Sequence, residues 1–176
     1  MMFPKTSLIL GGARSGKSAY AEKIAQISGL EKIYLATSQA LDDEMSARIS
    51  RHRDQRAGAG WRTIEEPVEL GRALRGAGAG EVVLIDCATL WLTNHLLASA
   101  DLEAEITGLV GAFESCAATV IVVSNELGQG NVAADAMTRR FNDAHGIMNQ
   151  SIAAKADYVA MVVAGLPMVL KGSAPA

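Results

Sequence analysis

The fold of this chain is decided by the stretch Gly11-Gly12-Ala13-Arg14-Ser15-Gly16-Lys17-Ser18. It follows the apolar run Leu8-Ile9-Leu10 and precedes a segment of helical periodicity, 18–27. This is the phosphate-loop pattern G-x-x-x-x-G-K-[ST] in a strand-to-helix context. The glycines let backbone N–H groups turn toward phosphate oxygens, and the following helix directs its positive end at them. We therefore predict a nucleotide site at 11–18, with Lys17 at the terminal phosphates and Ser18 on Mg²⁺. An ordinary glycine turn capped by Ser18 would not need Lys17.

Further apolar runs alternate with helical patterns along the chain. The runs lie at 33–35, 82–85, 120–123 and 158–163, and they are apolar throughout, as strands covered by helices on both faces are. The helical patterns lie at 42–53, 68–75, 89–98, 102–117 and within 133–156. We predict an α/β sandwich with a mostly parallel sheet, as one domain over 1–176, with Gly-Ala loops at 57–60 and 76–80.

Composition narrows the class of protein. The chain has 176 residues, 49% hydrophobic and 20% charged, which argues against disordered, collagen-like and coiled-coil proteins. The net charge is −3 and the basic residues are scattered, so nucleic acid is not expected as a partner. Cys87 and Cys116 lack zinc or redox spacing, which favours a reducing cytoplasm. No signal peptide is expected, and no membrane span, because the uncharged stretch 158–170 is too short.

A phosphate loop needs a second carboxylate to hold the metal or its water. Asp86 ends the apolar run 82–85 and is the first candidate. As an alternative, Asp86 caps the helix that follows it. Glu126 comes after the run 120–123, at the same carboxyl edge of a parallel sheet, and is the second candidate.

A basic segment surrounds one histidine. Its guanidinium groups, which are able to bind a second phosphate chain, are Arg48, Arg51, Arg53 and Arg56. The alternative is a solvated helix face whose charges complement the helix dipole. His52 lies among these arginines, and an imidazole can attack a phosphoryl or nucleotidyl centre. The alternative for His52 is an inert surface residue.

Several further blocks occur in one order along nearly the whole chain: Tyr34-Leu35-Ala36-Thr37-Ser38-Gln39, Leu41-Asp42-Asp43-Glu44-Met45, Arg48-Ile49, His52-Arg53-Asp54, Trp61-Arg62-Thr63-Ile64-Glu65, Thr93-Asn94, Asn125-Glu126-Leu127-Gly128 and Asn149-Gln150. With the phosphate loop, they make the chain resemble the bifunctional adenosylcobinamide kinase/adenosylcobinamide-phosphate guanylyltransferase family of cobalamin biosynthesis. It departs from that family in having Arg51-His52 where many members have two histidines, and in a slightly longer loop before Trp61.

The resemblance implies a RecA-like, three-layer phosphate-loop fold and a homotrimer. It also implies phosphorylation of the aminopropanol hydroxyl of adenosylcobinamide with ATP or GTP, followed by transfer of GMP from GTP to give adenosylcobinamide-GDP. The guanylylated histidine falls on His52. The nucleotide contacts outside the phosphate loop fall on Ala36, Thr37, Ser38, Arg53, Asp54, Gln55, Arg56, Glu65 and Asp86.

Two other functions remain open at this point. The first is a small-molecule kinase in which His52 is inert. The second is a nucleotide-dependent regulator whose switch segments respond to loss of the γ-phosphate. The basic segment around His52 argues against both, because neither function requires it.

Overall fold

The computed structural model describes residues 3–39, 58–127, 130 and 132–175. Within them, the strands are β1 (Thr6–Gly11), β2 (Glu31–Ala36), β3 (Trp61–Glu65), β4 (Glu81–Asp86), β5 (Thr119–Asn125), β6 (Tyr158–Val163) and β7 (Leu166–Lys171). The helices are α1 (Lys17–Ile27), α3 (Leu70–Arg75), α4 (Ala88–Leu97), α5 (Leu102–Ser115) and α6 (Ala136–Lys155). The predicted helix at 42–53 lies outside the described residues.

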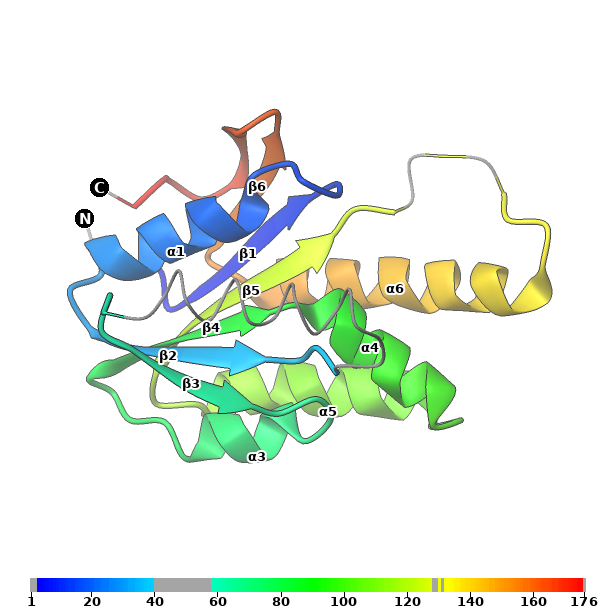
Figure 1. Cartoon of the computed structure of the whole chain (residues 1–176), viewed down its shortest axis with the longest axis horizontal. Coiled ribbons are helices and arrows are strands. Elements are labelled where there is room, and N and C mark those ends of the chain that lie inside the picture. The colour runs from blue at the N-terminus through cyan, green and yellow to red at the C-terminus, as the bar shows by residue number, and fades with distance from the viewer. Residues whose placement is uncertain (1–2, 40–57, 128–129, 131, 176) are drawn as a thin grey trace.

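The strands form one sheet in the order β3-β2-β4-β5-β1-β6-β7, shown in Figure 1. All pairs in the described sheet are parallel except β6 and β7, which are antiparallel. The strand that leads into the phosphate loop, β1, is separated from β4 by β5. Because parallel strands share one carboxyl edge, the residues that follow β1, β2, β4 and β5 meet there.

Helices cover both faces of the sheet, which explains why the central strands are apolar throughout. In β1, Leu8 and Leu10 pack into the core beneath α3, α4, α5 and α6, whereas Ile9 packs into the core beneath α1. All six residues of β1 are buried, and so are the middle residues of β4 and β5. The predicted mostly parallel α/β sandwich is confirmed.

Two strands were not predicted. Strand β3 lies at one edge of the sheet and mixes half-buried with exposed residues, so it lacks a continuous apolar run. Strand β7 is exposed along its whole length. It pairs with β6 through the two-residue turn Ala164-Gly165, where both residues have positive φ, 51° and 81°, as a tight hairpin turn requires. Among the described helices, none combines the length and apolar character needed to cross a bilayer.

Candidate nucleotide-binding site

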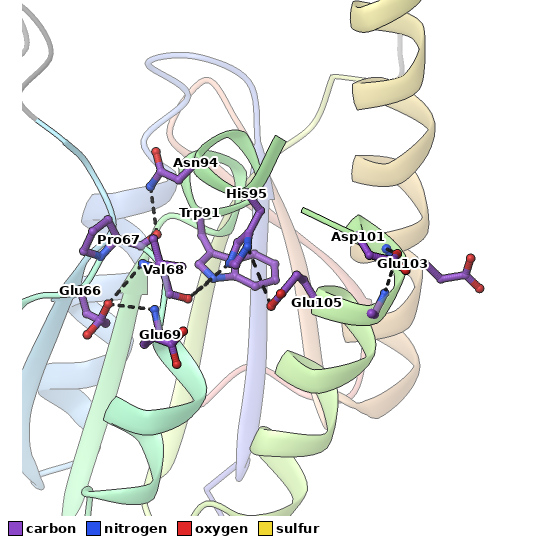
Figure 2. A network of polar contacts seen from close by, with 11 residues as sticks. Glu66, Pro67, Val68, Glu69, Trp91, Asn94, His95, Asp101, Glu103 and Glu105 are labelled. Atoms are coloured by element: carbon purple, nitrogen blue, oxygen red, sulfur yellow. Dashed lines mark hydrogen bonds and ion pairs between the residues drawn. The ribbon is translucent and has the colours of Figure 1, made fainter. Parts of the chain in front are cut away.

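The phosphate loop joins the end of β1 to the start of α1, as predicted. Gly16 is the N-cap of α1 and has a φ of 95°, in the left-handed region that favours glycine. It offers no side chain to the free N–H groups of the helix, and the first turn of α1 contains no acidic residue. By contrast, Asp101 caps α5 by accepting hydrogen bonds from the backbone N–H groups of Glu103 and Ala104 (Figure 2). Since no described side chain caps it, the N-terminus of α1 is suited to bind an anion from outside the chain.

The turn between β6 and β7 packs against the phosphate loop. The backbone N–H of Gly165 donates a hydrogen bond to the carbonyl oxygen of Ser15 at 2.8 Å. A Cβ atom at Gly16 would lie 3.2 Å from the Cα of Gly165, and one at Gly11 would lie 2.7 Å from the carbonyl oxygen of Val162. Both glycines allow an approach that other residues would obstruct.

Lys17 is half-buried, and its Nζ donates a hydrogen bond to the carbonyl oxygen of Gly12 at 3.1 Å. Its charge also reaches the end of β4. Burial and the Asp86 carboxylate raise the pKa of the Cys87 thiol to about 11, and the charge of Lys17 partly opposes this rise. Cys87 is therefore a protonated thiol, unsuited to act as a nucleophile. The charges of Asp86 and Lys17 thus both act on Cys87, with opposite effects on its pKa.

Three of the predicted contacts lie in one row across neighbouring strands. Ala36 of β2 pairs with Glu65 of β3 on one side and with Asp86 of β4 on the other. Glu65 is exposed and Asp86 is half-buried. The hydroxyl of Tyr34 donates a hydrogen bond to Oδ2 of Asp86 at 2.9 Å, which orients that carboxylate.

Thr37 is fully buried, and its side chain holds the chain that follows Asp86. Its hydroxyl donates to the carbonyl oxygen of Cys87 and accepts from the backbone N–H of Cys87, both at 2.8 Å. The backbone N–H of Thr37 also donates to the carbonyl oxygen of Asp86 at 3.3 Å. Thr37 thus fixes the position of the Asp86-Cys87 segment.

Side chains of helix α4 form hydrogen bonds to the segments that follow β2 and β3. Figure 2 shows those to the segment after β3. The side-chain amide of Asn94 donates to the carbonyl oxygens of Thr37 and Pro67, each at 2.9 Å. The indole N–H of Trp91 donates to the carbonyl oxygen of Val68 at 2.8 Å. In the sequence, the block Thr93-Asn94 was the only indication that α4 holds these loops, and nothing marked Trp91.

On the other side of β4, a buried polar network holds the end of β5. The hydroxyl of Thr89 accepts from the backbone N–H of Asn125 at 2.8 Å, and the amide of Asn149 donates to the carbonyl oxygen of Asn125 at 3.1 Å. Ser124 donates to Oδ1 of Asn149 at 2.7 Å. Nε2 of His145 lies 3.1 Å from the Thr89 hydroxyl. Burial lowers the pKa of His145, and the charge of Glu126 partly opposes this.

Glu126 follows this network directly and is half-buried. Its backbone N–H donates to the carbonyl oxygen of Gly11 at 3.1 Å, so it adjoins the first residue of the phosphate loop. Both candidate carboxylates, Asp86 and Glu126, thus follow strands at the edge that carries the loop.

The structure therefore brings together most of the predicted contacts at one edge of the sheet: Gly11, Gly12, Ala13, Arg14, Ser15, Gly16, Lys17, Ser18, Ala36, Thr37, Ser38, Glu65 and Asp86. The predicted nucleophile His52 and the contacts Arg53, Asp54, Gln55 and Arg56 lie outside the described residues.

The residues present fit a magnesium ion. Ser18, in the first turn of α1, and Asp86, oriented by Tyr34, supply the hard oxygen donors that Mg²⁺ prefers. In the described part of the chain, no group of three or more His, Cys, Asp or Glu side chains forms a metal cluster. Mg²⁺ does not need one, because it keeps several waters and takes substrate phosphates as ligands.

The fold and the site define a phosphate-loop nucleotide-binding protein of the RecA-like class. Solved structures support the fold. An ATPase of a type III secretion system matches with a TM-score of 0.53 at 13% identity, covering 93% of this chain and 56% of that one. The flagellar accessory protein FlaH from Methanocaldococcus jannaschii matches with a TM-score of 0.52 at 12% identity, covering 96% and 78%.

Sequence comparison gives the family. The family model described as cobinamide kinase / cobinamide phosphate guanyltransferase matches residues 7–170, and the chain belongs to this family of bifunctional enzymes. The bifunctional adenosylcobalamin biosynthesis protein CobP of Pseudomonas aeruginosa is 49% identical over 168 residues, 94% of this chain and 96% of that protein. The bifunctional adenosylcobalamin biosynthesis protein CobU of Escherichia coli is 39% identical over 180 residues, 93% and 98% respectively.

Proposed function

We propose that this enzyme phosphorylates the aminopropanol hydroxyl of adenosylcobinamide, using ATP or GTP, and then transfers GMP from GTP to the product. The second reaction gives adenosylcobinamide-GDP and passes through a guanylyl-histidine on His52. The observation that carries the proposal is the phosphate loop 11–18 between β1 and α1, with Lys17 at the start of the helix, in a chain of this family.

The kinase reaction places its main demands on the described residues. Backbone N–H groups of the phosphate loop and the free N-terminus of α1 bind the phosphates, and Lys17 exchanges its bond to Gly12 for one to the terminal phosphate. Ser18 and Asp86 would hold Mg²⁺, which neutralises charge on the phosphate oxygens when bound. Asp86 is preferred to Glu126 as its ligand because Tyr34 orients it.

Guanylyl transfer breaks a different bond. A neutral His52 nitrogen attacks the α-phosphorus of GTP, a P–N bond forms, and the α–β bridging bond breaks to release pyrophosphate. A phosphate oxygen of adenosylcobinamide phosphate then attacks the same phosphorus and displaces His52. The arginines beside His52 provide charge for the phosphates in both steps.

We also propose that residues 1–176 form a single domain, that the enzyme works in the cytoplasm and that it assembles as a homotrimer. Strand β7 supports self-association, because its exposed apolar side chains, Leu166, Met168, Val169 and Leu170, lie at the edge of the sheet. Sedimentation equilibrium of the purified chain tests the trimer: a monomer at all concentrations would contradict it.

Labelled GTP tests the two-reaction proposal. GTP carrying the label at the α-phosphate should label the protein, whereas label at the γ-phosphate alone should not. The bond should be labile in acid and stable in alkali, as a histidine phosphoramidate is. A wild-type protein that phosphorylates adenosylcobinamide but takes no α-label would favour a simple kinase. One that consumes no adenosylcobinamide at all would favour a nucleotide-dependent regulator.

A further inference from the structure

Helix α6 carries a glycine, Gly146, in its interior. Glycine destabilises a helix interior relative to alanine. Its φ is not positive, and a Cβ atom there would meet nothing within 4 Å. Neither the backbone conformation nor crowding by the described residues requires a glycine at this position. What the glycine does is leave space.

That space belongs to a cavity of about 310 Å³ between α6 and the ends of β1 and β5. From α6, the cavity is lined at intervals of three and four residues, so its lining is one face of the helix. A helix face that packs against a sheet is normally apolar, but this one carries Asn142, His145, Asn149 and Gln150.

The polar groups of this face divide into two sets. His145 and Asn149 are buried and engaged in the network that holds the end of β5. The side-chain amides of Asn142, which is half-buried, and Gln150, which is exposed, make no hydrogen bond within the described part of the chain. Their amide groups supply both donors and acceptors to the cavity.

The cavity adjoins the phosphate loop. Leu10 and Glu126 line it, and the backbone N–H of Glu126 donates to the carbonyl oxygen of Gly11 at 3.1 Å. A molecule in the cavity therefore reaches the loop from the face of the sheet opposite to α1.

We propose that this cavity receives the hydroxyl-bearing arm of the phosphoryl acceptor, a short chain with one amide and a secondary hydroxyl. This inference rests on the proposed kinase function. The volume lies at the lower end of the range for drug-sized ligands, about 300–1,000 Å³, so only the arm of a corrinoid enters and the macrocycle stays outside. Asn142 and Gln150 bind the amide, and Gly146 leaves room for the carbon chain.

Glu126 is the catalytic residue of this cavity. The acceptor hydroxyl oxygen forms a bond to the γ-phosphorus, and the bond from that phosphorus to the β–γ bridging oxygen breaks, leaving its electron pair on the nucleoside diphosphate. The hydroxyl proton passes to the Glu126 carboxylate. Asp86 is then left to the metal.

The variant Gly146→Leu tests the inference because it adds a side chain to a position that lines the cavity, where a Cβ atom meets nothing within 4 Å. The control is Gly111→Leu, at an exposed glycine of α5 where a Cβ atom also meets nothing within 4 Å. Phosphorylation of adenosylcobinamide is measured with the full chain, together with the melting temperature. The KM for adenosylcobinamide should rise at least about tenfold in Gly146→Leu while the KM for ATP stays within about twofold. The control should match the wild type in both KM values.

Two milder variants keep the test decisive if Gly146→Leu is unstable. Gln150→Ala should raise the KM for adenosylcobinamide by about fivefold, whereas Glu126→Gln should lower kcat with little change in KM. Wild-type acceptor KM values in a stable Gly146→Leu or in Gln150→Ala would overturn this inference and leave the kinase function standing. A wild-type chain that does not phosphorylate adenosylcobinamide would overturn the proposed function, and this inference with it.

Discussion

Tyr34 donates a hydrogen bond from its hydroxyl to Oδ2 of Asp86 at 2.9 Å, across the neighbouring strands β2 and β4. The bond fixes the direction of a carboxylate that is itself only half-buried. Among the described residues, no hydrogen bond is made to Oδ1 of Asp86. An ordered carboxylate at the edge of the sheet that carries the phosphate loop is what a magnesium–nucleotide complex requires.

The first prediction concerns this pair. Asp86→Asn keeps the shape of the side chain and removes its charge, so the Mg²⁺ concentration for half-maximal kinase activity should rise by about 10–100-fold. Tyr34→Phe loses one hydrogen bond, about 1 kcal/mol, and should raise the same concentration about fivefold. Titration of activity with Mg²⁺ measures both. If Glu126→Gln gives this pattern and Asp86→Asn does not, Glu126 is the carboxylate that supports the metal.

The second prediction concerns Lys17. Within the described residues its Nζ makes one hydrogen bond, to Gly12, so Lys17→Ala should lower the free energy of unfolding by about 1 kcal/mol. Loss of the charge at the terminal phosphate should reduce kcat for the kinase reaction at least about a hundredfold. Urea denaturation and initial rates give the two quantities. Kinase turnover close to that of the wild type would remove Lys17 from the mechanism.

The central strands and the phosphate loop were predictable because their determinants are local. Strands β1, β4 and β5 are buried on both faces, so each appears in the sequence as an unbroken apolar run. The loop 11–18 is contiguous, and its glycines and lysine have few other uses. Edge strands β3 and β7 lack two covered faces, and so they lack this signal.

The supports of the site were not predictable in the same way. Asn94 contacts Thr37 and Pro67, which lie 57 and 27 residues away in the chain, and Thr37 reaches Cys87 over 50 residues. Such pairs are set by the strand order, which periodicity does not reveal. His145 and Asn149 did carry a signal, since polar residues at i and i+4 interrupt the apolar face of α6.

The third prediction concerns Asn94. Asn94→Ala removes two hydrogen bonds and leaves the carbonyl oxygens of Thr37 and Pro67 without them, so the free energy of unfolding should fall by about 2 kcal/mol. The segments after β2 and β3 should also loosen, which raises the KM for nucleotide more than it lowers kcat. Thermal denaturation and steady-state kinetics test this. Leu97 is an exposed residue of the same helix, and Leu97→Ala serves as the control.

The fourth prediction concerns pH. Burial lowers the pKa of His145 below its ordinary value of 6.5, so at pH values below 6.5 the unfolded chain binds a proton that the folded chain does not. Stability should therefore fall as the pH drops through 6.5 toward the lower pKa of the folded state, and His145 should contribute no such loss above 6.5. Denaturant midpoints between pH 5 and 8 measure it. In His145→Gln, this part of the pH dependence should disappear; an identical slope in both proteins would show that other groups cause it.

The fifth prediction separates the two activities at His52. His52→Ala should abolish incorporation of α-label from GTP and the formation of adenosylcobinamide-GDP, because His52 is the residue proposed to carry the guanylyl group. Kinase activity should persist, since the phosphate loop 11–18 and Asp86 are unchanged. In the matched variant Lys17→Ala, transfer of the γ-phosphate should fall more than incorporation of α-label does. Both reactions are followed by separating the labelled corrinoid products. Persistent α-label in His52→Ala would assign the nucleophile to another residue, and loss of both activities would mean that His52 serves the kinase reaction as well.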